Sequence, residues 1–230
     1  MSESDVKVVL VPGAWADGSS WSKVINGLQS KDVSAVTVPV PLTTLADDVA
    51  AVDRTLERVG GPVVLVGHAY AGAVIGAVRN PRIKALVYVA ALAPDEGETV
   101  ADVFYRNEPH PKAPKLGADK HGLIWLPQEA FGAAFAQNAS AQELTVLAAV
   151  QRPISQACIS VPVGRPLWKD VPSWYLLAEQ DHMIVAETQR FMSERMKAQV
   201  SVHPVDHTPS VTAPDRVVDL ILRAVREVRD

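Results

Sequence analysis

The sequence predicts an α/β protein built on a mostly parallel sheet with helices on both faces. Two observations carry this prediction. Short aliphatic runs, typical of strands buried on both faces, recur at residues 6–11, 33–38, 63–66, 83–90, 171–178 and 200–205. Stretches of helical character alternate with these runs, which implies right-handed crossovers between parallel strands.

Composition limits the classes of function that need to be considered. The 230 residues are 48% hydrophobic and 21% charged, which suits one globular domain with a sizeable core. A formal net charge of -4 provides no basic surface for nucleic acid or for an anionic membrane. The polar, acidic first residues and the lack of a long apolar run predict a cytoplasmic protein. The single cysteine, Cys158, excludes an intrachain disulfide and a thiolate-cluster metal site.

Cap and turn residues mark the elements in the first half of the chain. The loop at residues 12–18 carries two glycines, which can turn backbone N–H groups inward, and it leads to a helix expected to begin near Ser19 or Ser20. Thr44 resembles the N-cap of a second helix, which runs to about Val59 and is ended by glycines. These signals support the alternation of strands and helices.

The pattern changes between residues 94 and 166. Prolines cluster there, and the periodic stretches are helical, at 128–136 and 141–149. We therefore expect a single domain in which a helical cap, residues 94–166, is inserted into a core formed by residues 1–93 and 167–230. Bulky aromatic residues outside the strands are expected where a lid encloses an apolar pocket.

The core pattern resumes after the predicted cap. The strand at 171–178 is followed by a helix at 187–198 and by the last strand at 200–205. A closing helix begins at Ser210, with Pro214 in its first turns.

The strand at residues 63–66 leads into the turn Gly67-His68-Ala69-Tyr70-Ala71. This spacing matches the G-x-S-x-G nucleophile elbow, in which a serine occupies a strained strand-to-helix turn between small residues. Ala69 occupies the position of that serine. Alanine preserves the shape of the turn and removes the reactive hydroxyl.

Asp181 and His207 each follow a predicted strand, in loops near its carboxyl end. Because the carboxyl ends of parallel strands open on the same edge of a sheet, we expect Ala69, Asp181 and His207 to converge. Their chain order, nucleophile position then acid then histidine, differs from two other well-known orders of serine hydrolases.

These motifs are similar to those of the α/β-hydrolase superfamily, in its compact branch with plant methylesterases, hydroxynitrile lyases and bacterial carboxylesterases. The resemblance covers essentially the whole chain and includes Leu10–Trp15, the elbow, the Asp181 loop and Asp206–Pro209. It implies the α/β-hydrolase fold, with His207 as general base, Asp181 orienting it, and the backbone N–H groups of Ala14 and Tyr70 as the oxyanion hole. Pro12 departs from the histidine that is common before Gly13, and Ala69 departs from the nucleophile.

Other acids and histidines have alternative interpretations. Asp95 is a rival for the catalytic acid, because some family members draw it from the strand before that residue. Asp206 is expected at the surface or behind the histidine, and His68 as a packing residue of the turn. His182 and His203 are expected to be exposed, and His110 and His121 lack metal-like spacing. We predict no metal and no cofactor.

With Ala69, the chain is expected to be nearly inert as an esterase, because losing the nucleophile costs on the order of a millionfold in kcat. We interpret Ala69 as an engineered serine-to-alanine replacement in a carboxylesterase or lactonase of the EC 3.1.1 class. A naturally degenerate hydrolase offers no evident reason for the dyad and the oxyanion loop to survive together. The alternatives are a His/Asp dyad enzyme, such as a lyase or cofactor-independent oxygenase, and a non-catalytic small-ligand receptor.

The expected partner is a small apolar ester or a related carbonyl compound. Trp125 is expected to lie closest to this ligand, with Tyr105 and Trp15 as weaker candidates. The alternative for Trp125 is an anchor between cap and core. Neither nucleic acid nor membrane is an expected partner, and the sequence leaves a homodimer open.

Overall fold

The computed structural model describes residues 6–229, which form a parallel six-stranded sheet with the order β2-β1-β3-β4-β7-β8. The fold class predicted from the sequence is confirmed. The strands are β1 (Lys7–Val11), β2 (Ala35–Thr37), β3 (Val63–His68), β4 (Ile83–Val89), β7 (Ser173–Ala178) and β8 (Gln199–His203). The chain reverses its direction of travel across the sheet between β1 and β3, and such switch points are where ligands bind in open α/β sheets.

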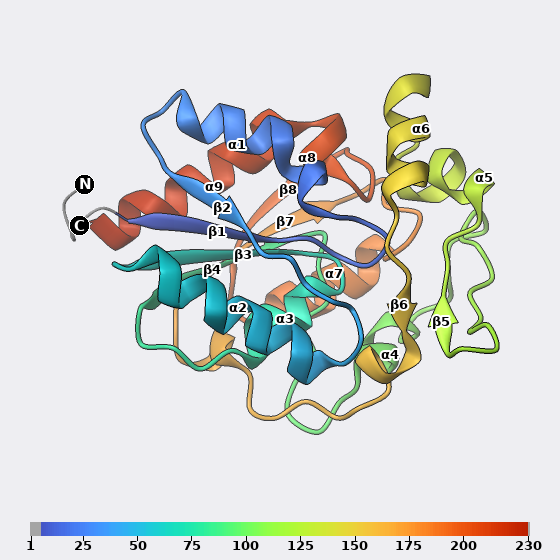
Figure 1. The fold of residues 1–230 in the computed structure, drawn as a ribbon, viewed down its shortest axis with the longest axis horizontal. Coiled ribbons are helices and arrows are strands. Elements are labelled where there is room, and N and C mark those ends of the chain that lie inside the picture. Colours follow the sequence, from blue (N-terminus) through green and yellow to red (C-terminus); the bar gives the residue numbers. More distant parts are fainter. Residues whose placement is uncertain (1–5, 230) are drawn as a thin grey trace.

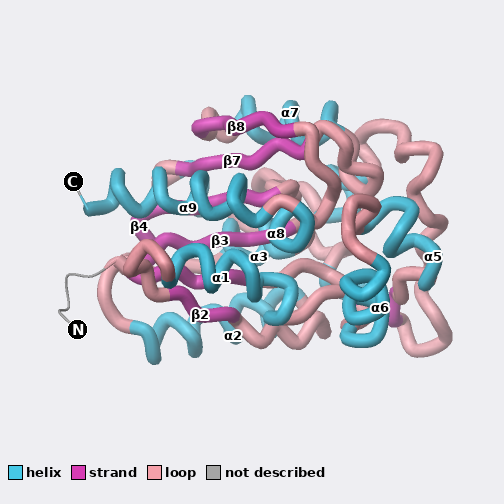
Figure 2. The backbone as a smooth tube through the Cα atoms, turned by 90° about the horizontal axis from the view of Figure 1, so that it is seen from above, coloured by secondary structure: helices cyan, strands magenta, loops and turns pink. Residues whose placement is uncertain are grey.

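Helices cover both faces of this sheet (Figures 1 and 2). On one face lie α1 (Ser22–Gln29), α8 (Pro209–Thr212) and α9 (Pro214–Arg229); on the other lie α2 (Leu45–Val59), α3 (Ala71–Ala77) and α7 (Ala186–Arg195). Each face has its own cluster of buried apolar residues, one including Trp21 and Trp174, the other Tyr88 and Tyr175. Because the inner strands are buried on both sides, their sequences are continuously apolar instead of alternating.

Several predicted helix boundaries differ from the observed ones, and α7 ends at Arg195 instead of residue 198. Asp17 caps a short 3-10 turn, η1 (Gly18–Trp21), so that α1 begins at Ser22 and not at Ser19 or Ser20. Pro214 begins a separate helix, α9, because a proline lacks the N–H that a continuous helix from Ser210 would need. Thr44 caps α2 as predicted, accepting a hydrogen bond from the Asp47 N–H at 3.0 Å.

Residues 94–166 contribute a group of short elements that lies beyond the carboxyl ends of the strands (Figure 1). They are α4 (Val100–Phe104), β5 (Leu123–Ile124), α5 (Gln128–Ala130), the π-helical turn η2 (Phe131–Phe135), α6 (Ala141–Val150), β6 (Ile154–Ser155) and η3 (Gln156–Cys158). A further short turn, η4 (Leu167–Lys169), leads back to β7. The antiparallel pair β5–β6 and helix α4 are not among the elements predicted from the sequence.

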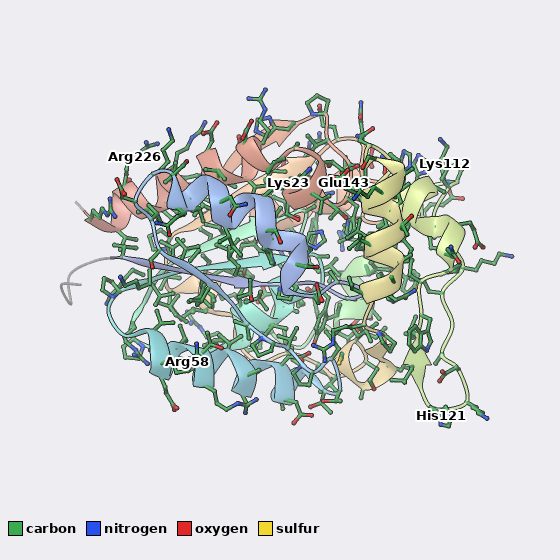
Figure 3. The ribbon with its side chains drawn as sticks, turned by 45° about the horizontal axis from the view of Figure 1, so that its top comes forward. Lys23, Arg58, Lys112, His121, Glu143 and Arg226 are labelled. Carbon is green, nitrogen blue, oxygen red and sulfur yellow. The ribbon has the colours of Figure 1, made fainter. Side chains whose placement is uncertain are left out.

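An ion pair connects this cap to the core on the α1 side. Lys23 on α1 contacts Glu143 on α6 at 2.5 Å (Figure 3). Other basic residues on the core helices, such as Arg58 and Arg226, are exposed to solvent (Figure 3). Among the described residues, no helix is both long and apolar enough to cross a membrane.

Candidate active site

The turn after β3 keeps the geometry of a nucleophile elbow although it lacks a nucleophile. Ala69 has φ +49°, in the left-handed region that side-chain-bearing residues seldom adopt. A Cβ atom added to Gly72 would lie 2.2 Å from the Leu92 carbonyl oxygen, and one added to Gly67 would lie 2.7 Å from that of Ala71. Close backbone approach therefore requires glycine on both sides of the turn.

His207 and Asp181 form a buried hydrogen-bonded dyad. The two side chains meet at 2.8 Å between His207 Nδ1 and Asp181 Oδ2. Asp181 also accepts the N–H groups of Met183 and Ile184, at 2.7 and 2.9 Å, and the side-chain amide of Gln189 at 2.9 Å. Four donors therefore surround the carboxylate. Because an ionised carboxylate only accepts, His207 carries its proton on Nδ1, and Nε2 keeps a free lone pair.

His68 is hydrogen-bonded to the backbone of the His207 loop. Its Nε2 donates to the His207 carbonyl oxygen at 2.7 Å, and the ring centroids of the two histidines are 4.8 Å apart. Burial, with a smaller contribution from the neighbouring His207, lowers the pKa of His68 to about 3. His68 is therefore a neutral packing residue of the turn, as expected from the sequence.

Two backbone donors lie beside Ala69. Ala14 and Tyr70 both line the cavity, and the N–H of neither residue hydrogen-bonds to another described residue. The adjacent Trp15 N–H is occupied, since it donates to the Arg152 carbonyl oxygen at 3.0 Å. Because buried N–H groups are nearly always paired, two free ones on residues that line a cavity are suited to receive a negatively charged oxygen.

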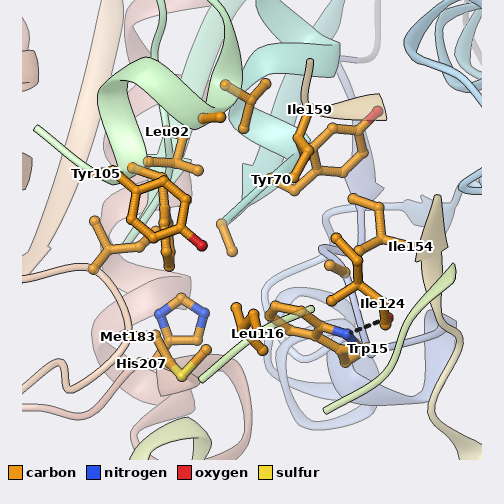
Figure 4. Close-up of a pocket in the computed structure, with 16 residues that line it drawn as sticks. Trp15, Tyr70, Leu92, Tyr105, Leu116, Ile124, Ile154, Ile159, Met183 and His207 are labelled. Atoms are coloured by element: carbon orange, nitrogen blue, oxygen red, sulfur yellow. Dashed lines mark hydrogen bonds between the residues drawn. The ribbon is translucent and has the colours of Figure 1, made fainter. Parts of the chain in front are cut away.

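The cavity above these groups has a volume of about 80 Å³, room for a small organic molecule. Its walls are aliphatic and aromatic, and they include Leu92, Val100, Phe104, Ile154 and Ile159 (Figure 4). The two lining hydroxyls differ. Tyr70 donates to the buried Asp48 at 2.7 Å, whereas the hydroxyl of Tyr105 has no described partner and points into the cavity (Figure 4).

Two of the three aromatic residues predicted to contact the ligand line the cavity, and the third does not. Trp15 and Tyr105 line the cavity, but Trp125 lies outside the lining and is 48% exposed. Its neighbour Ile124 lines the cavity instead, and the Trp15 indole N–H donates to the Ile124 carbonyl oxygen at 2.9 Å (Figure 4). Ile124 is the last residue of β5, and Trp125 follows the strand. Ile124 thus lines the cavity and Trp125 does not.

The alternative acids have other partners. Asp95 forms an ion pair with Lys169 and has no contact with His207, which leaves Asp181 as the acid of the dyad. Asp206 is fully buried and not at the surface, because it accepts the Asn138 N–H at 3.0 Å and the Thr212 hydroxyl at 2.6 Å. It thereby connects the cap to the His207 loop.

Sequence reasoning missed a further buried carboxyl group. Asp48 on α2 accepts the Leu42 N–H and the Tyr70 hydroxyl, each at 2.7 Å. Burial raises the pKa of the Asp48 carboxyl, and it raises the pKa of the neighbouring Cys158 thiol to about 12. From the sequence, Asp48 is indistinguishable from an exposed acidic residue in the first turn of a helix. Its burial and its hydrogen bond with Tyr70 are visible only in the tertiary structure.

His182, expected to be exposed, is partly buried and stacks on His110 with ring centroids 3.9 Å apart. Among residues 6–229, no group of three or more His, Cys, Asp or Glu side chains is arranged to hold a metal ion.

Comparison with known proteins gives one consistent result. The family model described as "Alpha/beta hydrolase family" matches residues 8–220. A probable hydrolase, R7, from Phoma sp. is 25% identical over 93% of this chain and 96% of its own length. Among solved structures, a pyrethroid hydrolase from Sphingobium faniae JZ-2 is 20% identical, with a TM-score of 0.80 over 96% of this chain and 98% of that one. Polyneuridine aldehyde esterase is 18% identical, with a TM-score of 0.77 over 99% and 100%.

Proposed function

The chain belongs to the alpha/beta hydrolase family, and on that premise we propose that its cavity is an ester-binding site of the acyl-transfer type that lacks its nucleophile. One observation carries the proposal: a single hydroxyl is missing from a frame in which the strained elbow, the histidine of the dyad and the two residues with free N–H groups all line one small apolar cavity. The ligand class that fits is a small apolar ester or lactone.

The parent of this chain, on this proposal, carried serine at position 69. A left-handed, non-glycine residue costs on the order of 1 kcal/mol, and an alanine there gains no reactive group in return. Engineered replacement of a serine explains this combination, because it changes one atom and leaves every other part of the frame in place.

In the serine form, the side chain of residue 69 would attack the ester carbonyl carbon while His207 Nε2 takes the hydroxyl proton. The N–H groups of Ala14 and Tyr70 would receive the oxyanion, and Asp181 would stabilise the imidazolium. His207 would return the proton to the leaving alkoxide, and a water molecule, activated in the same way, would release the acid.

The test is Ala69→Ser, assayed with p-nitrophenyl acetate and butyrate. We expect kcat to rise by up to about a millionfold, the effect of a nucleophile that acts as one unit with its base. The double variant Ala69→Ser/His207→Ala should return to the starting rate. The unchanged chain should bind the esters without turnover, since alanine leaves the apolar walls intact. A folded serine variant that is silent towards both esters would instead favour a small-ligand receptor.

A further inference from the structure

We propose that the chain with Ala69 has an activity of its own: it enolises small apolar ketones, exchanging the hydrogen atoms next to the carbonyl group. The inference uses the cavity assigned under the proposed function, but it does not depend on a serine at position 69. Removing a proton next to a carbonyl requires a base and donors for the enolate oxygen. The cavity supplies both, and its walls are largely apolar.

The base is His207. Its Nδ1 is fixed by Asp181 at 2.8 Å, so Nε2 is the unprotonated nitrogen, and no described residue hydrogen-bonds to it. A serine at position 69 would engage this lone pair with its hydroxyl. The Ala69 methyl group cannot, which leaves Nε2 free to accept a proton from carbon.

The enolate oxygen is served by the same two backbone N–H groups that would receive an ester oxyanion. Those of Ala14 and Tyr70 have no other described partner. They are fixed by the backbone, so they need no reorganisation when negative charge develops on the oxygen. Without a nucleophile at position 69, the carbonyl carbon is not attacked, and proton transfer is the chemistry that remains.

The cavity lining carries no positive charge. No lysine or arginine lines the cavity, and the adjacent His68 stays uncharged because its pKa is lowered to about 3. A nearby positive charge would weaken His207 as a base, and none is present among the lining residues. The buried Asp181 carboxylate, in contrast, stabilises the imidazolium that forms.

The proposed step involves only the ketone and the side chain of His207. The bond between the α-carbon and hydrogen breaks, its electron pair forms the carbon–carbon double bond, and the carbonyl π electrons move to the oxygen. His207 Nε2 takes the proton. The imidazolium then returns a proton to the same carbon, and in heavy water that proton is exchanged for a deuteron before its return.

The experiment follows the proton NMR signals of 2-butanone, cyclohexanone and phenylacetone in heavy water with the unchanged chain. We expect exchange about 10²- to 10⁴-fold faster than with an equal concentration of free imidazole. His207→Ala should reduce exchange to the imidazole level. His121→Ala is the matched control and should leave it unchanged, because His121 is exposed on a cap loop (Figure 3).

Ala69→Ser is a second variant that changes one atom and keeps His207 in place. It should slow exchange at least tenfold by engaging Nε2, while it creates the ester hydrolysis expected above. The two proposals can therefore fail separately, since hydrolysis without exchange contradicts only this one, and exchange without hydrolysis contradicts only the other. Exchange at the imidazole level with all three ketones, or exchange that persists in a folded His207→Ala variant, would overturn the inference.

Discussion

The two parts of the cap that border the active site are held in different ways. Residues 131–138, here the clamp segment, hydrogen-bond to the loops that carry Asp181 and His207. Residues 116–125, the rim segment, hydrogen-bond mainly among themselves and to β6 and the residue that follows it. The clamp contacts join His182 to Ala133, Thr208 to Phe135, Gln180 to Gln137 and Asp206 to Asn138, at 2.9, 2.6, 2.6 and 3.0 Å. Among described residues, one hydrogen bond, between Trp15 and Ile124, joins the rim segment to the core.

This difference indicates that the clamp segment positions the Asp181–His207 dyad, whereas the rim segment shapes the ligand cavity. Phe135, in the π-helical turn of the clamp segment, places its ring 5.3 Å from that of His207 and 6.3 Å from those of Trp15 and His68. Irregular π turns of this kind occur frequently at functional sites. The clamp segment is therefore fixed to the loops of the Asp181–His207 dyad, whereas the rim segment forms part of the cavity wall.

The largest effect is expected from Phe135→Ala. The ring is fully buried between cap and dyad, and removing such a side chain costs about 3–5 kcal/mol of stability. Leu116→Ala is the matched variant on the rim segment, where the side chain is only partly buried, and its cost should be clearly smaller. Denaturant unfolding of both variants measures the difference. Equal losses would show that the two segments are held alike.

The second prediction concerns the pH dependence of the free energy of unfolding, which His68 should control. The folded-state pKa of His68, about 3, lies below its ordinary value of 6.5. Between these pH values the unfolded chain binds one more proton, so this residue makes stability fall as pH falls, by about 1.4 kcal/mol per unit. Between pH 6.5 and pH 5 the loss should approach about 2 kcal/mol.

His68→Asn should remove this dependence, whereas His121→Ala should keep it. The measurement is the free energy of unfolding at several pH values for the three proteins. Parallel curves for the unchanged chain and the His68→Asn variant would show that His68 is not held neutral in the folded state.

The parts of the candidate site that depend on short sequence motifs and on the order of the strands could be predicted from the sequence. The elbow is a five-residue pattern, and the positions of Asp181 and His207 follow from the rule that loops at the carboxyl ends of parallel strands meet. For Asp206 the sequence left the surface and a place behind the histidine both open. Its partner Asn138 comes from the cap, and no local pattern predicts the contact that buries it.

The cap itself was less accessible to sequence reasoning. β5 and β6 are two residues each and are separated by about thirty residues, too short for alternation to be recognised. The π-helical turn has no sequence signature comparable to a capping box, so residues 128–136 read as one ordinary helix. Which residue of β5 faces the ligand depends on a register that only the tertiary structure fixes.

The smallest effect is expected at Trp125, where the comparison can be made between neighbours on the rim segment. Trp125 is 48% exposed, so Trp125→Ala should change stability by no more than about 0.5 kcal/mol and leave ketone and ester binding unchanged. Ile124→Ala should weaken binding, because its side chain is buried in the cavity wall. Ligand titrations and melting temperatures of the two variants provide the test. If Trp125→Ala weakens binding more than Ile124→Ala does, the indole closes over the cavity in the ligand-bound protein, and the rim segment moves where the clamp segment does not.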